Sequence, residues 1–226
     1  MLYVLKGVLD VPNNYFRLID NVALVWVNEV CRTVLDRYTD PYEQEKLYEM
    51  VTNVACSAFK VRHKIFPKDW RVNQFFYGQP ESETHYNEIV DEKKLTILMN
   101  ETMVDYNKAN PQEQISVIIF NSIIEKTLKI NRSIQIPFAN TILIADQGSG
   151  ANELCKMAIK LARASDNQLF ANDSEQLEDW RSHFRSIMQR VGLETKSRAV
   201  LHLIERDFIE GVLDTVNGLA AHGELF

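Results

Sequence analysis

Apolar residues recur every three to four positions along most of the chain, which is typical of helices with one side facing a core. Asp20 and either Thr39 or Asp40 can cap the second and third helices, and Pro41 suits a first helical position. Residues 115–128 are apolar almost all round, so we expect a deeply buried helix there. The pattern predicts helices over residues 2–9, 20–37, 41–59, 95–109, 115–130, 151–162, 175–191 and 208–219.

Three short apolar runs predict strands, over residues 142–144, 168–171 and 199–204. Ile142, Leu143 and Ile144 are apolar on both faces, as a covered parallel strand requires. The fold class predicted is mainly α with a partial α/β subdomain, in which a short parallel sheet of about three strands is flanked by helices. Residues 60–80 are less regular. Their aromatic group is expected to pack this connection onto the body and not to form a recognition patch: Phe66, Trp70, Phe75, Phe76 and Tyr77.

Composition narrows the class of protein. The chain has 226 residues, of which 46% are hydrophobic, and a net charge of −6. The negative charge disfavours a general nucleic-acid surface. The sequence holds neither a transmembrane run nor a basic, apolar leader. Cys31, Cys56 and Cys155 lie far apart, so we expect buried thiols in a reducing compartment.

The run from Asn140 to Leu154 predicts a strand, a turn containing Gly148 and Gly150, and the start of a helix. This is the shape of the phosphate-binding pattern G-x-x-x-x-G-K-S/T, in which backbone N–H groups and a helix N-terminus hold phosphate. Aligned on Gly150, the pattern has Ala151 where lysine meets phosphate and Asn152 where a hydroxyl holds Mg²⁺. The candidate nucleotide-binding residues of this degenerate loop are Gly148, Ser149, Gly150, Ala151 and Asn152.

The third predicted strand ends in Glu205-Arg206-Asp207. In nucleotide hydrolases a strand of this kind ends in an acid that organises Mg²⁺ and water, and Glu205 is the nearest candidate. The alternative is a solvated charge cluster that caps the last helix. His202 is expected to be a buried histidine with a local hydrogen bond, because no second ligand stands at a metal-binding spacing. The pattern indicates no catalytic triad and no metal site.

Several stretches, in order, resemble the heavy chain of dynein, most closely its axonemal branch. Residues 22–37, VALVWVNEVCRTVLDR, resemble the helix L-x-W-x-H-E-x-x-R-x-x-x-D-R of the third AAA+ module, with Asn28 where histidine is usual. Residues 86–107 resemble the linker into the fourth module, and residues 116–137 the helix before its nucleotide loop. Three further matches follow: 145–154 with G-V-G-G-S-G-R-Q-S-L, 180–188 with W-R-E-D-L-K-x-x-L, and 217–224 with N-N-L-L-N-S-G-E.

The resemblance implies two segments: residues 1–80 from the helical small subdomain of the third AAA+ module, and residues 81–226 from linker helices and a truncated large subdomain of the fourth. It implies a microtubule-motor context, a place in the cytoplasm and cytoskeleton of the ciliary or flagellar axoneme, and neighbouring AAA+ modules or axonemal proteins as partners. Nucleic acid and membrane are not expected partners. The family's motor hydrolyses ATP, but the loop predicts a structural or regulatory segment without catalytic residues or cofactor.

Two alternatives remain at the level of sequence. The first is a regulatory site that binds ATP or ADP with Mg²⁺ through the backbone N–H groups of residues 147–151 without efficient hydrolysis. The second is a short dynein-derived axonemal scaffold protein, in contrast to an excised piece of a giant chain. The family's sheet has five strands and this sequence supplies three, so the strands would pair differently or a partner would complete the sheet.

Overall fold

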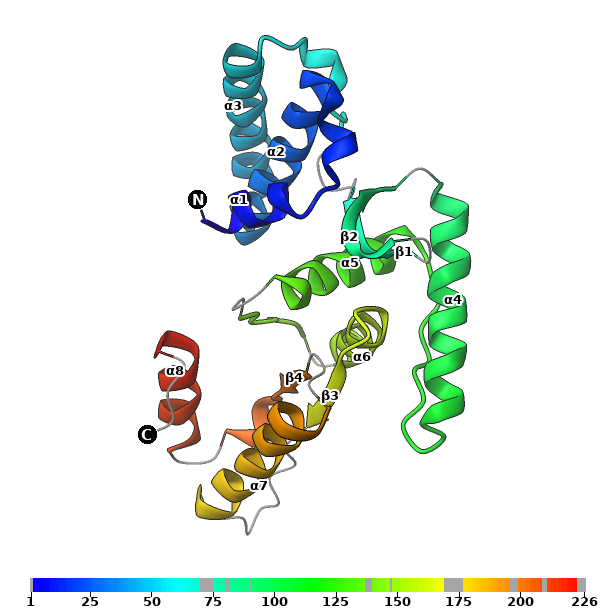
Figure 1. Ribbon diagram of the computed structural model, residues 1–226, viewed down its shortest axis with the longest axis vertical. Helices are drawn as coiled ribbons and strands as arrows, with labels where there is room; N and C mark the ends of the chain where they lie inside the picture. Colours follow the sequence, from blue (N-terminus) through cyan, green and yellow to red (C-terminus); the bar gives the residue numbers. More distant parts are fainter. Residues whose placement is uncertain are drawn as a thin grey trace. The chain divides into compact units, whose positions relative to one another are not determined.

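The computed structural model describes residues 2–69, 75–79, 82–89, 91–136, 140–146, 148–168, 177–195, 199–208 and 211–222. The chain forms two compact units, Met1–Ala158 and Ile159–Phe226. The elements of both units are drawn in Figure 1, and each unit is described by itself.

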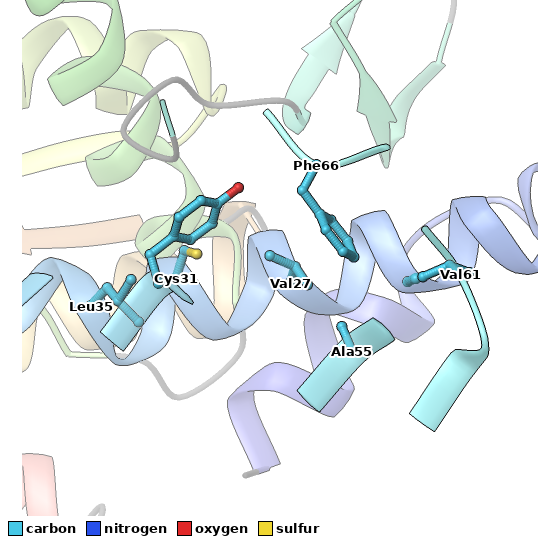
Figure 2. Packing of buried hydrophobic residues seen from close by; sticks show 8 residues of the cluster. Val27, Cys31, Leu35, Ala55, Val61 and Phe66 are labelled. Carbon is cyan, nitrogen blue, oxygen red and sulfur yellow. The ribbon is translucent and has the colours of Figure 1, made fainter. Parts of the chain in front are cut away.

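Three helices form the first layer of the first unit: α1 (Leu2–Leu9), α2 (Ile19–Thr33) and α3 (Pro41–Phe59). Short 3-10 turns lie at Asn13–Arg17, Leu35–Arg37 and His63–Ile65. The helices pack through small and branched side chains. Val27 and Cys31 of α2, Leu35 of the 3-10 turn after it and Ala55 of α3 belong to one buried cluster (Figure 2). The three helices therefore have the bounds that the apolar spacing predicts to within a few residues.

The N-cap predicted for α3 is confirmed, whereas the N-cap predicted for α2 is wrong. Asp40 is the N-cap of α3, where its carboxylate accepts the Tyr42 N–H at 2.9 Å, and Pro41 occupies the first turn. Asp20 is not a cap, because α2 starts one residue earlier with Leu18 at the N-cap. The inward face of α3 includes Tyr48 and Thr52, which are buried, whereas Met50 and Val54 are exposed.

An antiparallel hairpin that the pattern did not predict follows this layer. Its strands are β1 (Phe75–Gln79) and β2 (Ser82–Glu88), with Phe75 opposite Glu88. Phe75 and Tyr86 share a core with Val11 and Val25. The expectation that the aromatic group packs inward is confirmed for Phe66, Phe75 and Phe76. Trp70 and the side chain of Tyr77 lie outside the described residues.

The other helices of the first unit are α4 (Glu92–Ala109), α5 (Asn121–Gln135) and most of α6 (Ala151–Leu161). The predicted helix over residues 115–130 is wrong in its first part, because residues 114–120 have no helical structure and α5 begins at Asn121. The side chain of Asn107 explains the difference. It accepts the Ile115 N–H at 2.7 Å and donates to the Ile115 C=O at 2.9 Å, which competes with helix formation.

The second unit holds a two-stranded parallel sheet of β3 (Ser165–Gln168) and β4 (Ala199–His202). It continues with α7 (Leu177–Gln189), a π-helical turn Arg190–Thr195, a 3-10 turn Glu205–Asp207 and α8 (Val212–His222). Its core joins Trp180 and Phe184 of α7, stacked with centroids 5.5 Å apart, to Val212 of α8. Gly192 lies inside the π-helical turn.

The fold class is confirmed: the structure is mainly α with a partial α/β part. The sheet differs in detail. Within the described residues the parallel sheet has two strands, not three, because residues 142–144 are not a strand. Ser165 begins the second predicted strand earlier than expected, and residues 169–171 lie outside the described ranges, as do the cap candidates Asp173 and Ser174. No described helix has both the length and the apolar character needed to cross a membrane.

Candidate functional site

The turn before α6 has the backbone shape that the sequence predicts. Gly148 and Gly150 have φ values of +80° and +79°, in the left-handed region that favours glycine. The Ser149 N–H donates to the Asp146 C=O at 3.1 Å, and the Leu154 N–H donates to the Gly150 C=O at 3.0 Å. The chain therefore turns tightly at Ser149 and enters α6 at Ala151. Gln147 lies outside the described residues.

The side chains around this turn do not fit a bound nucleotide. Ala151 and Asn152 stand in the first turn of α6, where a lysine and a hydroxyl would contact phosphate and Mg²⁺. Glu153 occupies the same turn, and its Oε2 would be 3.9 Å from a Cβ at Gly150. A carboxylate there stabilises the positive end of the helix dipole and repels the negative charge of a polyphosphate.

A well-packed core supports the glycine turn. Leu154, Met157 and Ala158 of α6 are buried against Tyr106 of α4 and Ile130 of α5. The ammonium of Lys156 lies 2.8 Å from the carboxylate of Glu113, and the Asn131 side chain donates to the Ala158 C=O at 3.5 Å. The prediction that α6 has one apolar face is confirmed, and that face fixes the start of the helix.

The segment that leads into the turn corrects the buried-strand prediction. Ile142 and Ile144 are 88% and 92% exposed, and Leu143 is 46% exposed. Residues 140–146 form no described helix or strand. Their apolar character indicates a buried strand, but a strand also needs a hydrogen-bonded neighbour, and β3 and β4 pair with each other. The segment is anchored by the Thr141 hydroxyl, which donates to the Ser133 hydroxyl at 2.7 Å.

Glu205, the candidate acid, belongs to the second unit and is exposed. Asp207, two residues later, is buried, and its Oδ2 accepts the Ile204 N–H at 2.8 Å. The Asp207 N–H donates to the Ile204 C=O at 2.9 Å, so this acid closes the 3-10 turn at the end of β4. Asp207 is the third residue of the turn, and its carboxylate reaches back to the backbone N–H of the N-cap residue Ile204, as the acid of a capping box does. The glycine turn lies in the first unit.

His202 is half-buried and not fully buried as predicted, and it lies beside an acid on the neighbouring strand. Its Nδ1 lies 3.7 Å from Oδ1 of Asp166, on the neighbouring strand β3. Among the described residues, no group of His, Cys, Asp or Glu has an arrangement that could hold a metal ion.

The most deeply buried carboxylate lies outside both predicted sites. Glu29 of α2 is fully buried and pairs with Arg132 of α5. The stretch that resembles the dynein helix contains Glu29, but the spacing of residues alone could not indicate a partner 103 positions away.

Together the helical layer, the parallel strands and the glycine turn define a partial α/β region of the P-loop type. Residues 115–226 match the family model described as P-loop containing dynein motor region D4. The chain is 25% identical to human dynein axonemal heavy chain 3 over 98% of its own length. It is 21% identical to human dynein axonemal heavy chain 2 over 98%, and 20% identical to human dynein axonemal heavy chain 10 over 97%.

The chain belongs to the dynein heavy chain family. It spans 6% of the length of axonemal heavy chain 3 and 5% of the other two. The resemblance to an axonemal dynein heavy chain is therefore confirmed.

Proposed function

We propose that this chain is a non-catalytic, architectural segment of a dynein-type heavy chain. The observation that carries the proposal is the start of α6, which has Ala151, Asn152 and Glu153 at the positions around a phosphate. A P-loop contributes to hydrolysis through a lysine and a metal-binding hydroxyl, and neither side chain is present. The role left to the loop is to join the segment after α5 to a well-packed α6.

The proposal extends to organisation and place. We assign residues 1–80 to the helical small subdomain of one AAA+ module and residues 81–226 to the linker and truncated large subdomain of the next, the third and fourth modules. The names of the similar proteins support a location in the ciliary or flagellar axoneme. The partners that fit this role are neighbouring AAA+ modules and axonemal proteins, through protein contacts.

A second candidate function is a regulatory ADP or ATP site without turnover. The positive φ values of Gly148 and Gly150 favour it, since they preserve the turn that exposes backbone N–H groups to phosphate. The side chains weigh against it, because Glu153 competes for the same helix end.

Titration of the purified chain with a fluorescent ADP in the presence of Mg²⁺ separates the two functions. The architectural proposal predicts no saturable binding up to millimolar ADP. The control is Gly150→Asp, which adds a further carboxylate at the turn. Saturable binding by the unsubstituted chain that Gly150→Asp removes would establish the regulatory site and reject the architectural proposal.

A matched variant tests whether missing side chains explain the result. Ala151→Lys with Asn152→Thr restores both lost contacts. We expect the double variant to bind ADP more tightly than Ala151→Lys alone, because the metal contact is separate from the phosphate contact. Full ATP hydrolysis from Ala151→Lys alone would contradict the proposal, since one contact would then have rebuilt the site.

A further inference from the structure

Glu29 lies in the middle of α2 with no exposed surface. Its Oε1 accepts a hydrogen bond from Nε of Arg132 at 3.2 Å, and its Oε2 pairs with the second guanidinium nitrogen of the same arginine. A buried carboxylate is stable only when it is paired and hydrogen-bonded. Arg132 is almost as buried, so both charges depend on each other.

Two further elements complete this cluster. The Asn28 amide donates to the Tyr86 hydroxyl of β2 at 3.0 Å and to Glu29 at 3.3 Å. Burial, and next the charge of Glu29, raises the pKa of Tyr86 well above its usual value, and the two side chains are hydrogen-bonded. A Cβ at Gly7 of α1 would overlap the Glu29 carboxylate. Side chains from α2, β2 and α5 thus meet at Glu29 against the backbone of α1.

A second, more exposed ion pair joins α5 to the 3-10 turn that directly follows α2. Asp36 lies 3.4 Å from Nε of Arg32 and 3.2 Å from the ammonium of Lys129. Glu29 and Asp36 are seven positions apart in the sequence. They pair with Arg132 and Lys129 of α5, which are three positions apart. Both contacts form together only in one register of α5 along α2.

The helix that bears Arg132 also reaches the glycine turn. Ser133, the next residue, accepts the hydrogen bond from Thr141 that anchors the segment before the turn. Ile130 of α5 lies in the core that holds Leu154 and Met157 of α6. The glycine turn and the cluster at Glu29 thus both contact the same helix, α5, through different residues.

We propose that Glu29 and Arg132, with Asn28 and Tyr86, form a buried ionic latch that couples the α1–α3 layer to the helices bearing the glycine turn. The latch makes α2 and α5 open together and transmits displacement of one to the other. This proposal rests on the architectural function proposed above. The pair of Glu29 and Arg132 is the contact that transmits displacement between the α1–α3 layer and the helices that bear the glycine turn.

Native-state hydrogen exchange on the 226-residue chain tests the latch, because it reports the opening of α2 and α5 separately. The variants are Glu29→Gln, Arg132→Met and the double substitution. Each single change leaves one buried charge without its partner, so we expect amide protection to fall about 100-fold or more in both helices. The control is Asp105→Asn, which breaks the exposed pair with Lys108 and should change protection less than about threefold.

The double variant decides the proposal, because it removes both buried charges. The latch predicts a loss of protection at least about tenfold smaller than the product of the two single losses. The latch would be overturned if the loss of amide protection in the double variant equalled the product of the two single losses. It would also be overturned if each single loss stayed within the helix that carries the substitution. If a single variant fails to fold, Tyr86→Phe retains the ion pair and should lower protection in α2 and α5 together. Unchanged protection in either helix of Tyr86→Phe would also overturn the latch.

The two proposals fail in different ways. Nucleotide binding would reject the architectural function, but the losses of amide protection in the Glu29→Gln, Arg132→Met and double variants would still be non-additive. An additive cycle would reject the latch and would leave the ADP titration unchanged.

Discussion

At the scale of single residues, the glycine turn has the backbone conformation of a phosphate-binding loop, whereas its side chains differ from the phosphate-binding pattern. Gly148 and Gly150 hold the left-handed conformation of the turn, and open space surrounds a Cβ at Gly148. Ala151 and Asn152 leave the helix N-terminus without a phosphate ligand, and Glu153 supplies a negative charge there instead. The glycines are required by the turn itself, so they fit both the architectural function and the regulatory site proposed above.

The conformation of Gly150 gives a stability prediction. Gly150→Ala should lower the free energy of unfolding by about 1–2 kcal/mol, because an L-residue is strained at positive φ. Urea unfolding followed by circular dichroism measures the change. The matched control is Gly192→Ala, where a Cβ would meet open space and φ is not positive. Equal losses in the two variants would show that the turn does not require glycine.

The buried thiol of Cys31 gives a pH prediction. Burial raises the pKa of Cys31 from 9.0 to about 12. Above pH 9 the unfolded thiol releases its proton while the folded thiol keeps it, so this contribution to stability is complete below pH 9 and is lost toward pH 12. The loss from this group should not exceed about 1.4 kcal/mol per pH unit.

Urea unfolding between pH 8.5 and pH 10 measures that slope in the parent chain and in Cys31→Ala. Tyr15, Tyr48 and Tyr86 also have raised pKa values, but their ordinary value is 10.0, so the lower half of the range isolates Cys31. A shallower slope in Cys31→Ala is expected. The same slope in both chains would contradict the assignment.

At the scale of elements, capping decides where helices begin. Asp40 accepts the Tyr42 N–H, and its replacement by alanine should destabilise α3 by about 1 kcal/mol. Asp20→Ala is the matched control, because Leu18 holds the N-cap of α2 and Asp20 contributes only its charge in the first turn. Thermal unfolding of both variants measures the difference. A larger loss in Asp20→Ala than in Asp40→Ala would contradict the assigned helix starts.

Helical periodicity predicted α1, α3, α4, α6 and α7 well because each has an apolar face and clear end signals. Two predictions failed because apolar content does not specify a partner. Residues 114–120 have no regular secondary structure where Asn107 hydrogen-bonds to the backbone of Ile115, and residues 142–144 are exposed and pair with no described strand. The pairing of Glu29 with Arg132 joins distant positions, so local spacing could not indicate it.

The same limit applies to the candidate site. The loop residues were found because the turn is local, and its positive-φ glycines follow directly from the pattern. The position directly after the third predicted strand indicates Glu205 as the candidate acid. In the structure, however, the buried acid of this charged run is Asp207, which accepts a hydrogen bond from the Ile204 N–H. Only the folded chain reveals which acid of a charged run is buried.

At the scale of the whole molecule, two compact units divide the chain between helices α1–α5 with most of α6 and a smaller α/β part. Residues 115–226 match the dynein motor region D4, and the chain spans 6% of the length of axonemal heavy chain 3. Each of the two units has a packed apolar core of its own, which supports the architectural role proposed above.

Thermal unfolding of the chain with and without millimolar Mg-ADP or Mg-ATP tests the central claim most directly. A ligand that binds only the folded state adds about 2.7 kcal/mol of stability at a hundredfold excess over Kd. The architectural account predicts a cooperative transition whose midpoint does not move with either nucleotide. A midpoint that rises with nucleotide concentration, and that stays fixed in Gly150→Asp, would contradict it and would show that the glycine turn still holds nucleotide.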